Sequence, residues 1–416
     1  MRILVLGLLS VAVAAAQQGF LQTQSGHPLY PIGMYELPKT DAELQQMAEA
    51  GFNLVHCNNR ADLDRVAKAG MKGWVSLPMQ VGNDPARTLR KAVDAVKDHP
   101  ALAVLEGPDE IVWGFTAFSG KFRNGIYKQQ NEWWLQTPLA REYTDREGTK
   151  IMGKLREGIA LVRKLDGGRH PLWINEAARS DMKFIREYID GIDITGCDIY
   201  PVNGLDNETI SVVADYTRRY TSIGRGRPVW MVLQGFDWSA LPEYGPRKPA
   251  YPSYEQTRLM AYASITNGAK GILYWGTYLL KPEQAAFRSS LYAMASELAS
   301  LQPFLTAPEQ ESAKVVLTEA NGRAEPDQRG VTWICRKSGK DWLIALVNED
   351  GHAHMGVEVT GLTTLNGHEL VLLYGNETAA IEHGGFVTRL RPYEVKVFAT
   401  SRGWETKNLT GRDYGL

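Results

Sequence analysis

Residues 229–233 read Val-Trp-Met-Val-Leu, a continuous apolar run that ends at Gln234. A strand without polar alternation is buried on both faces, which is typical of a parallel sheet that helices cover. Similar short runs recur over residues 28–305, where they alternate with amphipathic helical patterns. The sequence therefore indicates repeated strand–helix units in this region.

Eight such units follow one another, and eight units closed into a ring form a (β/α)8 TIM barrel. A doubly wound open sheet is the alternative, but no Gly-x-Gly-x-x-Gly follows the first strand to support it. The helices are expected over residues 40–50, 61–69, 84–97, 145–165, 181–189, 211–223, 254–267 and 282–301. The strands are expected over residues 30–35, 52–57, 71–77, 101–105, 171–175, 192–197, 228–233 and 271–275.

The pattern changes near residue 313. Short runs rich in Val, Thr and aromatic residues follow, and turn signals such as Asn366-Gly367 separate them. We expect a small all-β sandwich over residues 313–400 and a polar tail over residues 401–416. The barrel itself is expected over residues 28–305.

The N-terminus has the pattern of a secretory signal peptide over residues 1–16. Arg2 supplies a positive charge, residues 3–13 form an apolar run too short to cross a bilayer, and residues 14–16 are three alanines. We therefore expect cleavage before Gln17 and a secreted or periplasmic protein. No later segment is apolar enough to hold the mature chain in a membrane.

Composition excludes several classes of partner. The formal net charge is −1, so nothing in the charge favours nucleic acid or a membrane surface. The three cysteines are widely spaced, which fits buried apolar side chains and matches no metal motif or disulfide framework. No metal and no organic cofactor is expected, and the oligomeric state is left open.

Residues 104–110 read Val-Leu-Glu-Gly-Pro-Asp-Glu, an apolar run that ends in two adjacent acids. Aromatic residues follow it closely, among them Trp113 and Trp134. A strand that delivers acids to its end beside flat apolar rings favours glycoside chemistry, since one acid must protonate a poor leaving group. The same pattern would also fit a helix start, with Asp109 as the cap and Glu110 exposed.

In a TIM barrel, catalytic residues lie at the carboxyl ends of the strands and in the loops that follow. This rule predicts one rim for residues from seven of the eight strands. Glu110, Asp109, Asp198 and Asp237 are the candidates for catalysis. The candidates for substrate binding are Tyr35, Glu36, Arg60, Trp113, Glu176, Tyr200, Gln234, Trp238 and Trp275.

Three of these segments resemble the same enzymes: the pair Asp109-Glu110, residues 198–201 (Asp-Ile-Tyr-Pro) and residues 274–275 (Tyr-Trp). With them, most of residues 28–400 resembles the clan-A-like (β/α)8 glycoside hydrolases that carry a C-terminal β-domain. Those enzymes place an Asn-Glu pair after the fourth strand. The resemblance therefore implies hydrolysis of O-glycosidic bonds in oligo- or polysaccharides, with Glu110 as the general acid/base.

The chain departs from that clan at the seventh strand, where the clan has a nucleophilic Glu and this chain has Gln234. A neutral amide cannot form the usual glycosyl-enzyme ester, so Gln234 is expected to bind a sugar hydroxyl instead. Another acid at the rim could serve, either Asp237, which is nearest in sequence, or one of Glu36, Glu176 and Asp198. Glu176 equally suits a helix start, where an acid favours the helix dipole. Retention and inversion both stay open.

Two alternative functions remain. Enzymes that cleave N-acetylhexosaminides by neighbouring-group attack carry an Asp-Glu pair after the fourth strand, which the pair Asp109-Glu110 resembles. There the Asp orients the acetamide group, the Glu is the acid, and no further protein nucleophile is needed. A glycan-binding protein with a lapsed hydrolase site is the other alternative.

Overall fold

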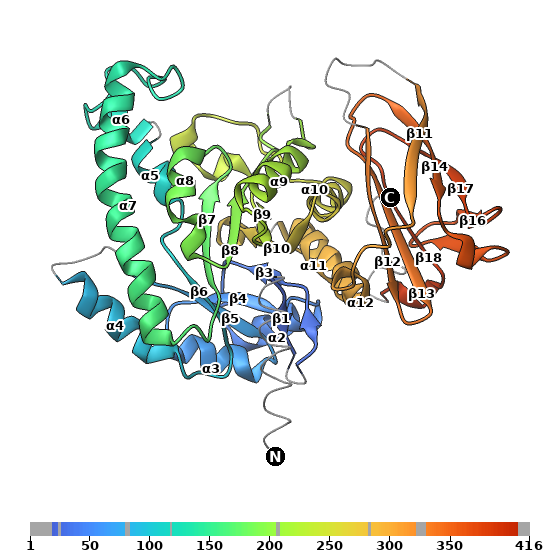
Figure 1. Cartoon of the computed structure of the whole chain (residues 1–416), viewed down its shortest axis with the longest axis horizontal. Helices are drawn as coiled ribbons and strands as arrows, with labels where there is room; N and C mark the ends of the chain where they lie inside the picture. Colours follow the sequence, from blue (N-terminus) through green and yellow to red (C-terminus); the bar gives the residue numbers. More distant parts are fainter. Residues whose placement is uncertain are drawn as a thin grey trace.

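The computed structural model describes residues 19–23, 26–79, 84–116, 119–204, 209–281, 284–321 and 330–406 (Figure 1). Eight parallel strands close into a barrel in the order β10-β3-β4-β5-β6-β7-β8-β9. This barrel confirms the predicted fold class, and every strand lies within two residues of its predicted position. The strands are β3 (Ile32–Met34), β4 (Leu54–Cys57), β5 (Lys72–Ser76), β6 (Leu102–Glu106), β7 (Leu172–Ala177), β8 (Ile194–Asp198), β9 (Val229–Gln234) and β10 (Ala269–Trp275).

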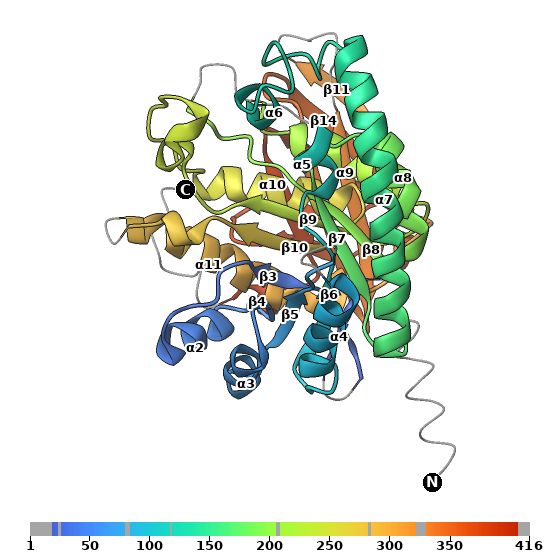
Figure 2. The same cartoon turned by 90° about the vertical axis from the view of Figure 1, so that its left-hand side faces the viewer.

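Helices surround the barrel (Figure 2). The predicted helix at residue 145 begins earlier, at Pro138, because the Thr137 side chain caps it by accepting from the Ala140 amide. Two short helices, α5 (Ile111–Thr116) and α6 (Ser119–Arg123), fill the excursion between β6 and this long helix. The main helices are α2 (Asp41–Glu49), α3 (Arg60–Lys68), α4 (Pro85–Val96), α7 (Pro138–Asp166), α8 (Met182–Tyr188), α9 (Val212–Ile223), α10 (Tyr254–Thr266) and α11 (Ala285–Ser300).

Large aromatic side chains fill the barrel interior. Trp74, Trp173 and Trp230 are fully buried and pack against one another, with ring centroids 5.7 Å and 5.2 Å apart. Glycines on neighbouring strands make room for them. A Cβ at Gly196 would lie 2.1 Å from the Trp230 carbonyl oxygen, and one at Gly271 would lie 2.7 Å from the Trp230 ring. The interior is therefore a packed core and the ligand-binding end must be one of its rims.

The amino-terminal end of the barrel is closed by a hairpin that the sequence did not predict, β1 (Leu21–Gln22) with β2 (Pro28–Leu29). Leu21 belongs to the same buried cluster as the barrel tryptophans. The Trp230 indole donates to the Gly19 carbonyl oxygen at 2.9 Å. The hairpin therefore occupies the end of the barrel opposite the carboxyl ends of the strands.

The C-terminal domain is a sandwich of two antiparallel sheets, ordered β11-β14-β17 and β12-β13-β18-β15-β16. Its interior holds side chains such as Trp342, Phe386 and Phe398. A short helix, α12 (Gln302–Leu305), leads into it. The strands are β11 (Lys314–Asn321), β12 (Val331–Ser338), β13 (Asp341–Asn348), β14 (His354–Thr360), β15 (Glu369–Leu372), β16 (Thr378–Ala380), β17 (Phe386–Leu390) and β18 (Val395–Ala399).

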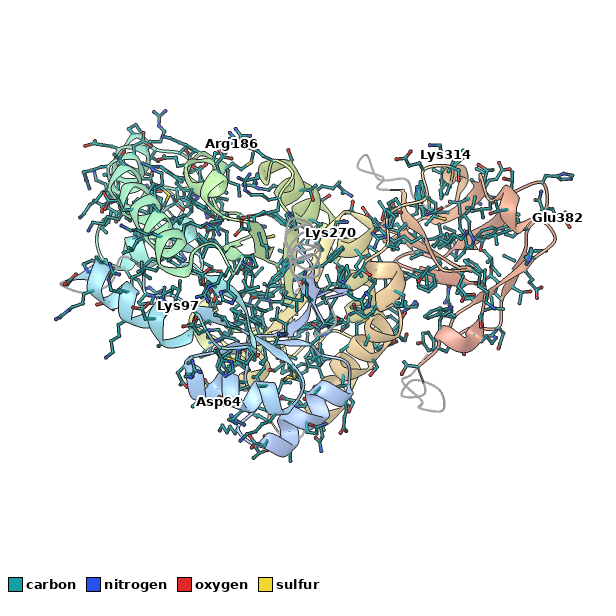
Figure 3. All side chains as sticks on the ribbon, turned by 60° about the horizontal axis from the view of Figure 1, so that its bottom comes forward. Asp64, Lys97, Arg186, Lys270, Lys314 and Glu382 are labelled. Carbon is teal, nitrogen blue, oxygen red and sulfur yellow. The ribbon has the colours of Figure 1, made fainter. Side chains whose placement is uncertain are left out.

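The barrel and the sandwich meet through α10, which packs against β12 and β13. Arg258 of α10 donates to the Val395 carbonyl oxygen of β18 at 2.8 Å. Lys270, which Figure 3 labels, lies beside this junction and lines a cavity there with Trp333 and Arg336. In the described ranges, none of the helices combines the length and apolar character that a membrane crossing requires.

The expected signal peptide, residues 1–16, lies outside the described residues, as do residues 407–416 of the expected tail. Residues 402–404 of that tail form a short 3-10 helix. The ring of Trp404 packs edge-on against Phe304 at 4.7 Å. All three cysteines are buried and free.

Candidate active site

The pair Asp109-Glu110 follows β6 at the carboxyl end of the barrel, where it joins the strand to α5. Glu110 has a backbone φ of 46°, a left-handed conformation that is uncommon for a residue other than glycine. Its amide donates to the Asn175 carbonyl oxygen on β7 at 3.0 Å, which fixes the turn. Such strained positions cluster at functional sites, where the surrounding structure enforces them.

A chain of polar contacts links three strand ends. The Asn175 side-chain amide donates to Asp109 Oδ1 at 3.0 Å and to Asp198 Oδ1 at 3.2 Å. The side chain of Asp198, the last residue of β8, interacts with the Glu110 carboxyl. The carboxyl groups of Asp109, Glu110 and Asp198 therefore lie together at these strand ends.

The ionisation of these groups is perturbed toward the neutral form. Burial, and then the charge of Asp109, raise the pKa of Glu110 to about 7. Burial also raises the pKa of Asp198 well above its usual range, with further contributions from Glu110 and Asp109. Asp109 has an exposed surface, but the surrounding protein removes water from its carboxyl group. This desolvation raises the pKa of Asp109 as well. No lysine or arginine is among the groups that shift these pKa values.

A fourth carboxyl group, Glu106, completes the cluster, and we did not single it out from the sequence. Glu106 is the last residue of β6 and is 1 % exposed. It accepts from the Trp74 indole at 3.2 Å, from the Tyr35 hydroxyl at 3.4 Å and from the Ser76 hydroxyl. Burial, and then the charge of Asp109, raise its pKa to about 8. The signal that could have found it is an acid inside an otherwise apolar strand.

Ser76 also connects this cluster to the rim of the barrel. The Ser76 hydroxyl lies 2.9 Å from His56 Nε2, at the end of β4. The contacts His56–Ser76–Glu106 therefore form a hydrogen-bonded line from the half-buried His56 to the buried carboxyl. Burial lowers the pKa of His56, so the imidazole is neutral at neutral pH.

Aromatic rings lie directly beside the carboxyl groups. Tyr200, two residues after Asp198, stacks on Trp275 with centroids 5.5 Å apart and planes at 23°. The Trp238 indole donates to the Tyr200 carbonyl oxygen at 3.1 Å. Tyr35 contacts Trp74 edge-on at 5.1 Å. Tyr35, Tyr200, Trp238 and Trp275 all keep part of their surface exposed, so the rings form an accessible wall at the rim.

Gln234 and Asp237, both predicted for this rim, are engaged by the protein itself. The Gln234 amide donates to the carbonyl oxygens of Val202 at 2.7 Å and Phe236 at 3.0 Å, and its oxygen accepts from the Val202 amide at 3.0 Å. It is fully buried and holds the loop after β8 against β9. Asp237 is 2 % exposed and accepts from the amide and hydroxyl of Ser239, which caps the 3-10 helix η2 (Trp238–Ala240).

Glu36 and Glu176 have comparable structural contacts. Glu36 accepts from the Gly276 amide at 2.9 Å and from the Thr277 hydroxyl at 2.7 Å, so it ties the loop after β10 to β3. Glu176 is fully buried and accepts from the Val112 amide at 3.1 Å and from the Ser180 and Tyr188 hydroxyls at 2.7 Å and 3.1 Å. None of these hydrogen bonds joins Glu36 or Glu176 to Glu110, Asp109 or Asp198.

Arg60 and Trp113 lie further from the carboxyl groups. Arg60 begins α3 and donates to the Ala95 carbonyl oxygen on α4 at 3.4 Å. Trp113, in α5, contacts Trp134 with centroids 5.8 Å apart. The structure thus brings together Glu110, Asp109 and Asp198, with aromatic rings beside them, and directs Arg60 to a neighbouring helix. In the described part of the chain, no group of three His, Cys, Asp or Glu side chains could hold a metal ion.

Similarity to known proteins is found in structure alone. No protein family and no curated protein matches the sequence. A β-galactosidase from Bacillus circulans superimposes with a TM-score of 0.56 at 8% identity, covering 91% of this chain and 100% of that one. An isomaltulose synthase from a Klebsiella species gives 0.51 at 8% identity, covering 89% and 98%. AmyP bound to maltose gives 0.50 at 11% identity, covering 94% and 98%.

These structural neighbours share the fold of this chain, an eight-stranded parallel barrel followed by a sheet domain. They cover nearly the whole chain, so the fold that they share includes the sandwich. At such low identity the likeness is one of fold, and fold does not determine function. The chemistry has to be argued from the residues at the rim.

Proposed function

We propose that the chain is a glycoside hydrolase that cleaves O-glycosidic bonds of oligo- or polysaccharides, with Glu110 as its general acid. The observation that carries the proposal is the cluster of Glu110 with Asp109 and Asp198, which Asn175 links at the carboxyl end of the barrel beside the stacked rings of Tyr200 and Trp275. An acid whose pKa is raised to about 7 is still protonated in mildly acidic solution and can donate to the glycosidic oxygen.

In this scheme the other groups at the rim support the transition state. Glu110 donates its proton to the leaving oxygen, which leaves a positive, oxocarbenium-like centre on the sugar ring. The Asp198 carboxyl, which interacts with that of Glu110, lies beside that centre. Tyr200 and Trp275 offer flat faces to the sugar. Asp198 is the best-placed second acid, because the Asp237 carboxyl caps its own helix.

A second candidate is an N-acetylhexosaminidase that uses the substrate acetamide as nucleophile. One observation favours it: the residue at the position of the usual nucleophile, Gln234, is neutral and bonded to the loop after β8. Asp109 is next to Glu110, exposed, and held by Asn175. In that mechanism Asp109 orients the acetamide nitrogen and Glu110 remains the acid.

One experiment separates these possibilities from a glycan-binding protein without activity. Aryl glycosides with a poor leaving group, including N-acetylglucosaminides, are tested with the full chain and with its Glu110→Gln variant. A hydrolase loses turnover in the variant but keeps sugar binding, since the amide preserves the shape of the side chain. Turnover of N-acetylglucosaminides alone selects the second candidate. Binding without turnover in both proteins contradicts the proposal that the chain is an enzyme.

Export belongs to the same proposal. The support is the pattern of residues 1–16, a charged start followed by a short apolar run and small residues. Expression with the native N-terminus and mass spectrometry of the mature protein tests it. The expected product begins at Gln17, and an intact Met1 would contradict it.

A further inference from the structure

All four exposed aromatic side chains in the described part of the chain lie in segments that follow the carboxyl ends of barrel strands. Phe122 and Trp134 follow β6, Tyr244 follows β9 and Tyr278 follows β10, with exposed fractions between 44% and 61%. The other exposed large side chains are aliphatic, namely Leu135 in the same β6 loop and Val316, Leu317 and Val387 on the sandwich. Single exposed apolar residues are ordinary, but aromatic rings confined to one face mark a binding surface.

These rings lie on two sides of the carboxyl groups. In the closed barrel, β6 and β10 are separated by three strands in either direction, so they lie across the ring from each other. Figure 2 shows α5 and α6, which flank the β6 side, at the end of the barrel away from the N-terminus. We name Trp113, Phe122 and Trp134 the β6 flank, and Trp238, Tyr244 and Tyr278 the β9–β10 flank.

The β6 flank is held in place before any ligand binds. The Arg179 guanidinium lies over the Trp134 ring at 5.8 Å, and Arg179 Nε donates to the Tyr216 hydroxyl at 3.0 Å. Trp113 also contacts Trp134, with centroids 5.8 Å apart and the planes tilted by 52°. Trp134 is still 45% exposed. A ring fixed in this way loses little conformational entropy when a sugar covers it.

The β9–β10 flank is continuous with the aromatic wall of the proposed site. Tyr278 contacts Trp275 edge-on at 5.8 Å, and Tyr244 contacts Trp238 edge-on at 5.3 Å. Trp275 in turn stacks on Tyr200, two residues after Asp198. Rings therefore continue outward from the carboxyl pair on this side, and the β6 flank continues outward from Glu110 on the other.

We propose that the two flanks bind successive sugars of one glycan chain, so that the substrate is an oligo- or polysaccharide cleaved within the chain. This inference rests on the proposed function, since it assigns sugar subsites on both sides of Glu110. A terminal sugar alone would cover one flank and leave the other exposed. Flat rings suit a glycan because the apolar faces of sugar rings stack on them, and a net charge of −1 offers no general attraction for nucleic acid.

Affinity electrophoresis of the full-length Glu110→Gln chain tests the binding step, with gels that contain glycol chitosan, hydroxyethyl cellulose, soluble starch or galactan. At least one of these polysaccharides is expected to retard the chain. Trp134→Ala and Tyr278→Ala, each added to Glu110→Gln, are expected to weaken that binding roughly tenfold, which corresponds to about 1.4 kcal/mol. Val387→Ala, an exposed apolar residue on the sandwich, is the matched control and keeps the retardation.

Kinetics in the otherwise wild-type chain tests the cleavage step. Trp134→Ala and Tyr278→Ala are expected to lower kcat/KM for the retarding polysaccharide and leave kcat/KM for an aryl monosaccharide nearly unchanged. Viscosity of the polysaccharide should fall early, when few reducing ends have formed, because internal cuts shorten chains fastest. Circular dichroism melting confirms that each variant is folded, and Trp134→Phe, which keeps a flat ring, should restore part of the loss.

Several results would overturn this proposal. They are the absence of retardation by all four polysaccharides, equal retardation of the variants and the parent, or a slow viscosity decrease at a given number of reducing ends. A change of oligomeric state in Trp134→Ala, with unchanged glycan binding, would identify the β6 flank as a contact between copies of the chain. Failure of the proposed function gives a different result. The polysaccharide would still retard the chain, and wild type and Glu110→Gln would show no difference in hydrolytic activity.

Discussion

The buried carboxyl groups of two regions of this molecule have different surroundings. At the junction with the sandwich, Glu297 of α11 is fully buried and accepts from the Arg258 guanidinium at 2.8–3.0 Å and from the hydroxyls of Tyr254 and Tyr262 at 2.9 Å and 2.8 Å. At the barrel rim, Glu110 interacts with Asp198, and no arginine or lysine is among the main causes of the pKa shift of either.

The difference gives the carboxyl groups of the two regions different chemistry. A carboxylate in a buried ion pair keeps its charge and stays in one place, which serves the packing of two domains. A carboxyl buried without a cation becomes neutral easily and can give up a proton near neutral pH. Glu349 follows the first pattern, since it accepts from Arg218 at 3.0 Å and from Asn267 at 2.6 Å.

The largest expected effect tests the structural side of this comparison. Glu297→Ala leaves Arg258 buried without its partner, and such a change lowers the free energy of unfolding by roughly 3–5 kcal/mol. Urea denaturation measures the loss. Glu110→Gln is the control and should leave the free energy of unfolding at neutral pH unchanged or higher. Equal destabilisation by the two variants would contradict the distinction.

A smaller effect concerns stability against pH, through Glu106. Its pKa is raised from 4.5 to about 8 in the folded state, so the folded chain binds the proton more tightly than the unfolded chain. This contribution is complete below pH 4.5 and is lost as the pH rises through about 8. At pH 8, the free energy of unfolding of Glu106→Gln should therefore exceed that of wild type by on the order of 1–3 kcal/mol.

Melting temperatures of both proteins between pH 5 and pH 9 provide the measurement for Glu106. The wild type should lose stability with rising pH more steeply than Glu106→Gln. Ser76→Ala is the matched control, because it removes one hydrogen bond to the carboxyl and keeps the titrating group. Parallel curves for wild type and Glu106→Gln would mean that Glu106 does not hold a proton in the folded chain.

The smallest expected effect is a shift of the pH–rate profile in Asp109→Asn. The charge of Asp109 is one cause of the raised pKa of Glu110, so its removal lowers that pKa. The alkaline limb of kcat/KM should then move to lower pH, while an unrelated acid such as Asp181 gives no shift when changed to Asn. An alkaline limb that stays in place would show that Asp109 does not act on the proton donor.

The fold was predictable from the sequence because its signals are local and repeated. Continuous apolar runs such as residues 229–233 specify strands buried on both faces, and every unit carries the same signal. The start of α7 at Pro138 escaped prediction because its cap, Thr137, lies in an excursion of thirty-one residues between β6 and that helix. The hairpin β1–β2 escaped because its strands have two residues each.

The site was only partly predictable, because strand position gives the rim but not the orientation of a side chain. Asp109, Glu110 and Asp198 were expected at one place and the structure brings them into one hydrogen-bonded group. Gln234 is bonded to Val202, thirty-two residues away, which no local pattern reveals. In the sequence, Glu106 is one polar residue in an apolar strand. Only its hydrogen bonds from Tyr35, after β3, and Trp74, on β5, show that it is buried.

The most direct test of the account is the pH dependence of kcat/KM in wild type and Glu110→Gln, for two aryl glycosides of the same sugar with a good and a poor leaving group. We predict an alkaline limb near pH 7 in the wild type and its absence in the variant. For the glycoside with the poor leaving group, kcat/KM of the variant should be lower than that of wild type by roughly 10²–10⁴-fold. For the glycoside with the good leaving group, kcat/KM should change far less. The same limb and similar rates in both proteins would show that Glu110 is not the proton donor.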